Sequence, residues 1–243
     1  MNLGQTFQRF FNDWQKFLWM GLGALIVQLV GGAVMIILGV ATMGPSILTL
    51  LAGGPDMATL AVLGGMSVFA LASLVLGVVA AGLVYAGLIG SVVAYRRGEE
   101  VSLSTFWSYA RQYFGKMILL GIIIAVIMLV SAILLIIPIL GWLVWFVWVP
   151  VASVTLSIYP AYLVINDGYS VGDALSTGFR VLRSMFVEAL IGGVILLVFG
   201  LVLGLIGSVP LLGWIVVMLF GEPLLLFVLT ERFETEVRPR LAA

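Results

Sequence analysis

Long uninterrupted apolar runs are the main feature of this sequence. A helix of about 20 apolar residues crosses the hydrocarbon core of a bilayer. The sequence contains six such runs, at 17–43, within 57–95, and at 117–137, 142–165, 187–207 and 211–230. The second run is too long for one upright span, so we expect the turns before Gly64 to lie at the membrane surface. The runs lack the alternation of a transmembrane barrel, which leaves helices as the predicted structure.

Cationic residues all lie on one side of these six spans. They precede the first span, lie between spans two and three or four and five, or follow the sixth. The opposite loops, near 44–56, 138–141 and 208–210, contain none. The eleven cationic residues are Arg9, Lys16, Arg96, Arg97, Arg111, Lys116, Arg180, Arg183, Arg232, Arg238 and Arg240. By the positive-inside rule, both the N-terminus and the C-terminus are predicted to be cytoplasmic.

The chain also repeats itself after 72 residues. The segment PILGW at 138–142 has its counterpart in PLLGW at 210–214, and Ser104-Thr105 has its counterpart in Ser176-Thr177. Proline and glycine end helices, and tryptophan favours the headgroup boundary, so both segments are predicted to form the same outer turn. The turn residues are Pro138, Gly141, Trp142, Pro210, Gly213 and Trp214.

An amphipathic stretch precedes each repeated hairpin. Residues 103–114 and 171–186 have apolar side chains at the spacing of a one-faced helix, and 3–17 carry a similar stripe. Ser170 and Asp173 fit a helix capping box, with Asp in place of the usual Glu. We expect these helices to lie in the cytoplasmic interface, with basic residues toward anionic headgroups or a partner. Those basic residues are Arg111, Lys116, Arg180 and Arg183.

Together these patterns predict an all-α integral membrane protein with a single membrane domain over residues 1–243. We expect three repeated units, about 1–97, 98–168 and 169–233, each an interfacial amphipathic helix followed by a transmembrane hairpin. A short polar tail, 231–243, completes the chain. Successive units keep the same orientation, unlike the inverted repeats of many secondary transporters.

The segments IIPILGWLVWFVW and YLVINDGYSVGDALSTGFRVLR, followed by a further hairpin, resemble a six-span family of largely uncharacterised prokaryotic membrane proteins. The family includes YciC-like proteins and the membrane domain of glycerophosphoryl diester phosphodiesterases. The resemblance implies a fold and a location in the plasma (inner) membrane, and no established activity. The phosphodiesterase activity in that family belongs to a separate soluble domain, for which residues 231–243 offer no room.

Composition narrows the chemistry that this chain can perform. It has 63% hydrophobic and 9% charged residues and a mean hydropathy of +1.27, as expected when lipid is the main solvent. Without Cys or His, the sequence excludes thiolate and imidazole metal sites and imidazole acid–base catalysis. We therefore expect no enzyme activity, no cofactor, no metal site and no nucleic-acid partner.

Glu222 is the most distinctive candidate residue, because it lies inside the sixth span. An ionisable side chain at mid-membrane costs about 2.5–3.5 kcal/mol and faces a bundle interior or a cavity. It could bind a proton, cation or substrate, or its carboxyl could tie helices together through Ser, Thr or Tyr. Pro223 next to it predicts a kink. Pro150 and Pro160 likewise predict a bent fourth span.

Other charged residues have simpler interpretations. Glu188 is expected to pair with Arg180 or Arg183 near the inner interface. Arg96-Arg97 are expected to anchor the second span, and Asp167 and Asp173 to form a turn and a helix cap.

Two functions are compatible with these features. The favoured one is a non-catalytic protein that acts by interaction at the inner leaflet, as a scaffold, an assembly partner or an envelope-homeostasis factor. The alternative is a transporter or channel for a lipid or small solute that uses Glu222. The expected partners are membrane lipids, with other membrane proteins or further copies of the chain left open.

Overall fold

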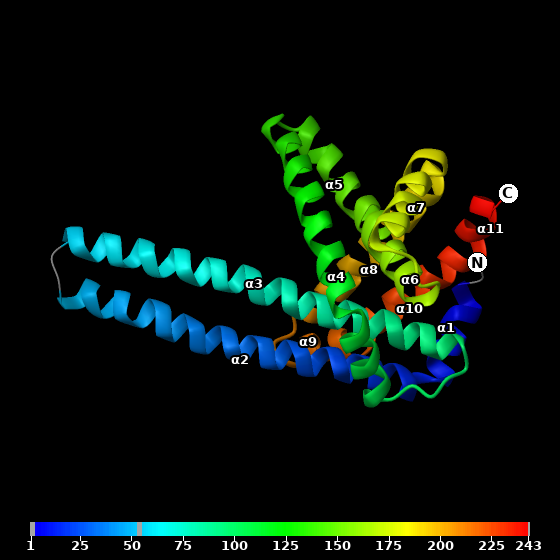
Figure 1. The fold of residues 1–243 in the computed structure, drawn as a ribbon, viewed down its shortest axis with the longest axis horizontal. Coiled ribbons are helices and arrows are strands. Elements are labelled where there is room, and N and C mark those ends of the chain that lie inside the picture. The colour runs from blue at the N-terminus through cyan, green and yellow to red at the C-terminus, as the bar shows by residue number, and fades with distance from the viewer. Residues whose placement is uncertain (1–2, 53–54, 243) are drawn as a thin grey trace. The chain divides into compact units, whose positions relative to one another are not determined.

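The computed structural model describes the backbone of residues 3–52 and 55–242 and the side chains of residues 4–42, 44 and 64–241. Helices occupy most of this part of the chain, and no strand occurs in it. Six helical stretches are long and apolar enough to cross a membrane: Trp14–Thr42, Gly64–Arg96, Leu103–Ile136, Leu140–Asn166, Phe186–Gly207 and Leu212–Leu241. The chain is therefore an all-α, multi-pass membrane protein, as the apolar pattern predicts (Figure 1).

The helices follow one another with short connections. The α-helices are α1 (Leu3–Asn12), α2 (Trp14–Ala52), α3 (Pro55–Arg96), α4 (Leu103–Ser131), α5 (Leu140–Ala152), α6 (Tyr159–Asn166), α7 (Val171–Ser184), α8 (Phe186–Gly207), α9 (Leu212–Val216), α10 (Glu222–Arg232) and α11 (Arg238–Ala242). A 3-10 helix, η1 (Ala132–Ile136), follows α4. Three π-helices interrupt the later spans: η2 (Ser153–Ile158), η3 (Val217–Gly221) and η4 (Phe233–Val237).

The chain divides into two compact units. Unit 1 consists of Met1–Leu25 and Gly82–Ala243, and unit 2 of Ile26–Ala81. Unit 2 is a helical hairpin in which Gly39 faces the Phe69 ring and Gly31 faces Ala80. The loop expected over 44–56 is helical on both sides of residues 53–54, which lie outside the described residues, as do 1–2 and 243. Both α2 and α3 are roughly 60 Å long at 1.5 Å per residue, about twice the hydrocarbon thickness.

Small residues allow close packing inside unit 1. The Phe106 ring, from the start of α4, lies against both Gly23 and Gly87, and Tyr109 lies against Gly90. A Cβ atom on any of these glycines would overlap the aromatic ring beside it. Because small residues let helices and side chains approach closely without a strong hydrophobic driving force in lipid, these contacts set how α2, α3 and α4 pack.

The amphipathic stretches differ from the expected set of three separate interfacial helices. The second stretch is the beginning of α4, which runs without a break from Leu103 to Ser131. The third stretch is a separate helix, α7, which ends at Met185, where φ is −132° and ψ is 47°. Its Ser170 cap accepts a hydrogen bond from the Asp173 backbone N–H at 3.1 Å, as predicted. The Asp173 carboxylate accepts from the Ser170 hydroxyl instead of the backbone N–H of a full capping box.

Each π-helix ends two residues before a proline. They precede Pro160, Pro223 and Pro239. A proline lacks the N–H that an α-helix needs and its ring displaces the carbonyl of the preceding turn, so widening the helix before it relieves both effects. The bends expected from Pro160 and Pro223 are therefore π-helical widenings. Pro150, in contrast, lies inside the regular helix α5.

The turns that precede α5 and α9 have the same backbone geometry. Ile139 and Leu211 both adopt positive φ angles, 61° and 60°. Gly141 and Gly213 follow them, and a Cβ on either would overlap the carbonyl oxygen of Leu134 or Ile206. Positive φ in a β-branched or bulky residue is strained. The same strain and the same glycine requirement thus occur 72 residues apart.

Gly178 provides a test of how α7 is held. A Cβ on Gly178 would overlap the Thr155 carbonyl oxygen, and backbone cannot move aside as a flexible side chain can. We expect Gly178→Ala to lower the free energy of unfolding by more than about 2 kcal/mol. Gly172→Ala, on the same helix, meets only the Ser170 hydroxyl at 3.8 Å and should be neutral or stabilising. Thermal unfolding in mild detergent compares the two, and equal midpoints would contradict the close contact.

Candidate functional site

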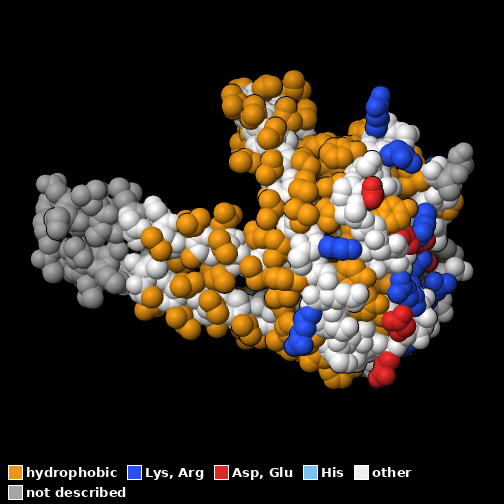
Figure 2. All heavy atoms as spheres, viewed as in Figure 1, with side chains coloured by type: hydrophobic (Ala, Val, Ile, Leu, Met, Phe, Trp, Pro, Cys, Tyr) orange, Lys and Arg blue, Asp and Glu red, His pale blue; other side chains and the backbone are white. Residues whose placement is uncertain are grey.

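Most charged side chains of unit 1 lie toward the end that carries both chain termini (Figures 1 and 2). Ion pairs there join α1 to α10, α8 to α11, and Asp167 to α11. The opposite turn between α4 and α5 is covered by exposed apolar side chains, including Ile136, Ile139 and Trp142. This separation matches a helical bundle with one aqueous end and one apolar body.

Arg232 is the centre of a buried polar network at this end. Its side chain is only 1% exposed. The guanidinium contacts the Glu188 carboxylate at 2.5 Å, the Glu188 backbone oxygen at 2.8 Å and the Tyr159 hydroxyl at 3.3 Å. Its Nε lies 3.2 Å from the Glu236 carboxylate, close enough for an ion pair but not aligned for a hydrogen bond. Arg232 therefore ties together α6, α8, α10 and η4.

Glu188 has different partners from those expected. It was predicted to pair with Arg180 or Arg183, but it pairs with Arg232 and, at 2.6 Å, with Arg240. Arg180 and Arg183 lie on α7, which the break at Met185 separates from α8. The prediction failed because it assumed that Arg180, Arg183 and Glu188 share one continuous helix, whereas the break at Met185 puts the arginines and Glu188 on different helices.

Gly192 makes room for this network. A Cβ at Gly192 would lie 3.1 Å from the Arg232 guanidinium and 3.2 Å from the Tyr159 hydroxyl. Tyr159 also packs against Phe233, with ring centroids 4.7 Å apart. The segment 231–243, expected as a short polar tail, is helical through Ala242 and buries Arg232, Phe233 and Val237.

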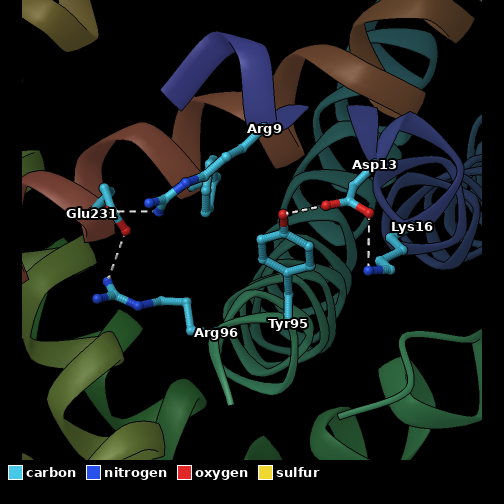
Figure 3. Close-up of a pocket in the computed structure, with 7 residues that line it drawn as sticks. Arg9, Asp13, Lys16, Tyr95, Arg96 and Glu231 are labelled. Atoms are coloured by element: carbon cyan, nitrogen blue, oxygen red, sulfur yellow. Dashed lines mark hydrogen bonds and ion pairs between the residues drawn. The ribbon is translucent and has the colours of Figure 1, made fainter. Parts of the chain in front are cut away.

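A pocket of about 480 Å³ is lined by Glu231, the residue before Arg232, and by six other side chains (Figure 3). Three cationic side chains, two carboxylates and two aromatic rings line it: Arg9, Asp13, Lys16, Tyr95, Arg96, Phe227 and Glu231. The elements that supply them are α1, the start of α2, the end of α3 and α10, together with Asp13 between α1 and α2. The pocket is therefore formed by segments from both ends of the chain.

One half of the pocket is organised around Asp13. The Tyr95 hydroxyl donates to its carboxylate at 2.7 Å, and Lys16 approaches it at 2.9 Å. These two contacts hold the pKa of Asp13 below its usual value, with the Tyr95 hydrogen bond as the larger cause. Asp13 therefore stays ionised, and its charge is matched locally by Lys16.

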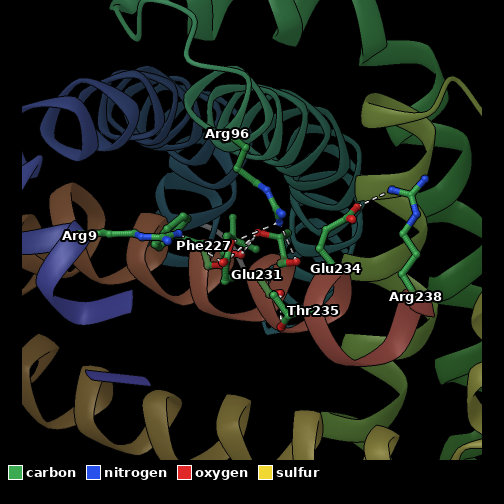
Figure 4. Close-up of polar contacts among 9 residues, drawn as sticks. Arg9, Arg96, Phe227, Glu231, Glu234, Thr235 and Arg238 are labelled. Atoms are coloured by element: carbon green, nitrogen blue, oxygen red, sulfur yellow. Dashed lines mark hydrogen bonds and ion pairs between the residues drawn. The ribbon is translucent and has the colours of Figure 1, made fainter. Parts of the chain in front are cut away.

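The other half is organised around Glu231. Arg9 and Arg96 each approach its carboxylate at 3.5 Å, and Arg96 also donates to the Thr230 backbone oxygen at 3.1 Å (Figure 4). About two turns farther on, Arg238 bridges Glu234 at 2.6 Å and Asp167 at 3.1 Å. Asp167 is thus held by Arg238 as well as lying at the turn that ends α6.

Two of the pocket-lining residues, Tyr95 and Phe227, pack against each other and against Phe17. Phe17, Tyr95 and Phe227 form a mutually contacting trio, with ring centroids 5.2 to 5.5 Å apart. Phe17 and Phe227 are almost fully buried. Edge-to-face aromatic contacts of this kind fix ring positions as well as burying apolar area. The ring contacts therefore hold Tyr95 and Phe227 in position in the pocket wall.

The four basic residues predicted to meet lipid or a partner are all exposed. Arg111 and Lys116 lie on α4, and Arg180 and Arg183 on α7. Lys116 sits over the Tyr113 ring at 5.7 Å. Within the described part of the chain, none of the four makes an ion pair with an acidic side chain. Phe179, on the same helix as the α7 arginines, is exposed as well.

Glu222 lies at the first position of α10, directly after η3. Its side chain is half-buried. Among the described residues it has no hydrogen-bond or ion-pair partner, so the expected tie to Ser, Thr or Tyr is not formed as a direct hydrogen bond. Glu222 does not belong to the pocket or to the Arg232 network.

Sequence reasoning missed the two clusters that hold this end together. It placed Arg9 before the first span and Arg232 after the last, and it named neither Asp13 nor Glu231. One signal was available: several acidic residues lie on the same side as the cations, so pairing between distant segments was possible. Which acidic side chain pairs with which basic one depends on how the helices pack, and the apolar pattern of the sequence does not specify that packing.

In comparisons with protein-family models, curated proteins and solved structures, no match to this chain was found.

The buried network around Arg232 should contribute to the stability of the folded protein. Removing the closer of the two carboxylates beside a buried guanidinium leaves its charge only partly compensated by Glu236, so Glu188→Gln should lower the free energy of unfolding by about 3 kcal/mol. Arg240→Gln removes an exposed partner of the same carboxylate and should cost less than about 1 kcal/mol. Thermal unfolding of both variants in mild detergent tests the ranking. An Arg240→Gln variant as unstable as Glu188→Gln would refute the central place of Arg232.

Proposed function

We propose that this protein acts without catalysis, by interaction at the inner leaflet of the plasma membrane, as a scaffold, an assembly partner or an envelope-homeostasis factor. The observation that carries the proposal is the exposed face of α7, where Arg180 and Arg183 lie on the same helix as exposed Phe179. Most other cations at this end are engaged in contacts within unit 1. Arginines left free of such contacts suit anionic headgroups or an acidic partner surface.

Orientation and architecture belong to the same proposal. Both termini lie in the cytoplasm, in keeping with the one-sided distribution of cations. The two hairpins 72 residues apart are copies of one unit, supported by the equal φ angles at Ile139 and Leu211 and by the shared glycine requirement. The relationship to YciC-like proteins and phosphodiesterase membrane domains is part of this proposal too.

Charge reversal on α7 tests the interaction. We expect Arg180→Glu with Arg183→Glu to reduce co-purification of phosphatidylglycerol at least about fivefold, because each basic residue near an anionic surface is worth about 1 kcal/mol. The protein is reconstituted in vesicles of phosphatidylcholine and phosphatidylglycerol, extracted in mild detergent, and its bound lipid quantified. The matched control, Arg180→Lys with Arg183→Lys, keeps the charge and should retain the lipid. Equal enrichment in the wild type and the glutamate variant would overturn the proposal.

A second candidate function, transport, rests on Glu222. Its carboxyl has no direct partner in the described chain and follows a π-helix, a distortion that often marks functional sites. A half-buried carboxyl next to a widened helical turn is suited to accept and release a proton. The substrate class in this case is a proton or small cation, or a lipid or solute coupled to it.

Proton flux into liposomes tests this second candidate. In vesicles with a pH-sensitive dye and an imposed potassium gradient, transport through Glu222 predicts a flux that Glu222→Gln abolishes, because the amide cannot carry a proton. Glu100→Gln, in the exposed loop after α3, should leave the flux unchanged. A flux that Glu222→Gln does not reduce, or no flux above empty vesicles, would exclude the site.

A further inference from the structure

We propose that the pocket between α1, the start of α2, the end of α3 and α10 binds the phosphate group of a membrane lipid headgroup. The inference rests on the proposed function, since it names a ligand for an interaction at the inner leaflet. The site is separate from the α7 face, because none of the residues lining the pocket belongs to α7.

The size and charge of the pocket fit this ligand. Its volume of about 480 Å³ lies within the range of small-molecule sites, about 300–1,000 Å³. Three cationic side chains against two carboxylates leave one positive charge in the lining. A phosphate ester therefore enters a site of opposite net charge.

The two halves of the pocket differ in how much cationic charge is free. Asp13 and Lys16 are 2.9 Å apart and neutralise each other, and the Tyr95 hydroxyl is engaged by the same carboxylate. The Glu231 half has two guanidinium groups for one carboxylate (Figures 3 and 4). The excess positive charge is thus located between Arg9 and Arg96.

The contacts of Glu231 are long enough to be displaced. Both arginines approach it at 3.5 Å, whereas charge-assisted N–H···O bonds are about 2.7–2.9 Å. Arg9 is 60% exposed and Arg96 24% exposed, so one arginine lies at the rim and the other inside. Arginine presents a planar set of donors that matches phosphate oxygens, and a phosphate between the two can form shorter bonds than Glu231 does.

The neighbouring residues favour a lipid as the source of the phosphate. Trp14 follows pocket-lining Asp13 directly, and both Trp14 and Trp19 are exposed at the start of the first span. Tryptophan is enriched at the headgroup level of a bilayer.

Calorimetric titration of the full chain in mild detergent tests the site. The probes are dihexanoyl phosphatidic acid, the matching dihexanoyl glycerol without phosphate, and inorganic phosphate. We expect phosphatidic acid to bind and dihexanoyl glycerol to bind at least about tenfold more weakly, since the phosphate contacts are lost. Inorganic phosphate binding as tightly as phosphatidic acid would overturn the lipid assignment in favour of a soluble phosphate ligand.

Two substitutions in the pocket should act in opposite directions. Arg9→Gln removes a donor and should weaken phosphatidic acid binding about tenfold. Glu231→Gln removes the carboxylate that competes for the two arginines and should tighten phosphatidic acid binding. Arg240→Gln, on α11 outside both the pocket and the α7 face, is the control and should change nothing. Shifts of the same sign in Arg9→Gln and Glu231→Gln, or an Arg240→Gln effect equal to that of Arg9→Gln, would refute the site.

The Arg180→Glu, Arg183→Glu protein separates this inference from the proposed function. It should bind phosphatidic acid in the pocket as the wild type does, although it loses phosphatidylglycerol from the α7 face. Loss of pocket binding in that variant would contradict a separate site. Failure of the α7 test with intact pocket titrations would remove the proposed function and leave the pocket.

Discussion

The buried charge of Arg232 constrains much of unit 1. A guanidinium this far from solvent is tolerable only where carboxylates and hydrogen-bond acceptors surround it. These partners come from three other segments: Tyr159 in α6, Glu188 in α8 and Glu236 in η4. The helices must therefore meet at one place and in one rotation. Gly192 is part of that requirement, because a Cβ atom there would crowd the guanidinium at 3.1 Å. The network thus specifies helix arrangement more than it adds net stability.

Backbone geometry serves the same arrangement. The π-helices before Pro160, Pro223 and Pro239 interrupt the fourth and sixth spans, where regular helices would have passed straight through. The π-helix η4 places Glu236 next to Arg232. Gly178 lets α7 pack closely against the π-helix η2. Proline-induced widening, glycine contacts and ion pairs therefore depend on one another in unit 1.

The charged end combines two kinds of cation with different physical roles. Arg232, Arg238 and Arg240 form ion pairs with acidic side chains of the same protein. Arg111, Arg180 and Arg183 are exposed on helices whose opposite sides pack inward. Arg9 and Arg96 are intermediate, since they reach Glu231 only at 3.5 Å and line an open pocket. This gradation from paired to unpaired charge supports interaction with phosphate-bearing lipids at this end.

The sequence by itself determined the all-α class, the six spans and the residues of the two outer turns, because these follow from local apolar length and from proline and glycine chemistry. It also determined the Ser170 cap, a contact over three residues. Only the tertiary structure decided that α4 is unbroken, that the last segment is helical and buried, and that Glu188 meets Arg232 instead of Arg183. Pairing across 44 residues depends on helix rotation and approach, which local periodicity does not encode.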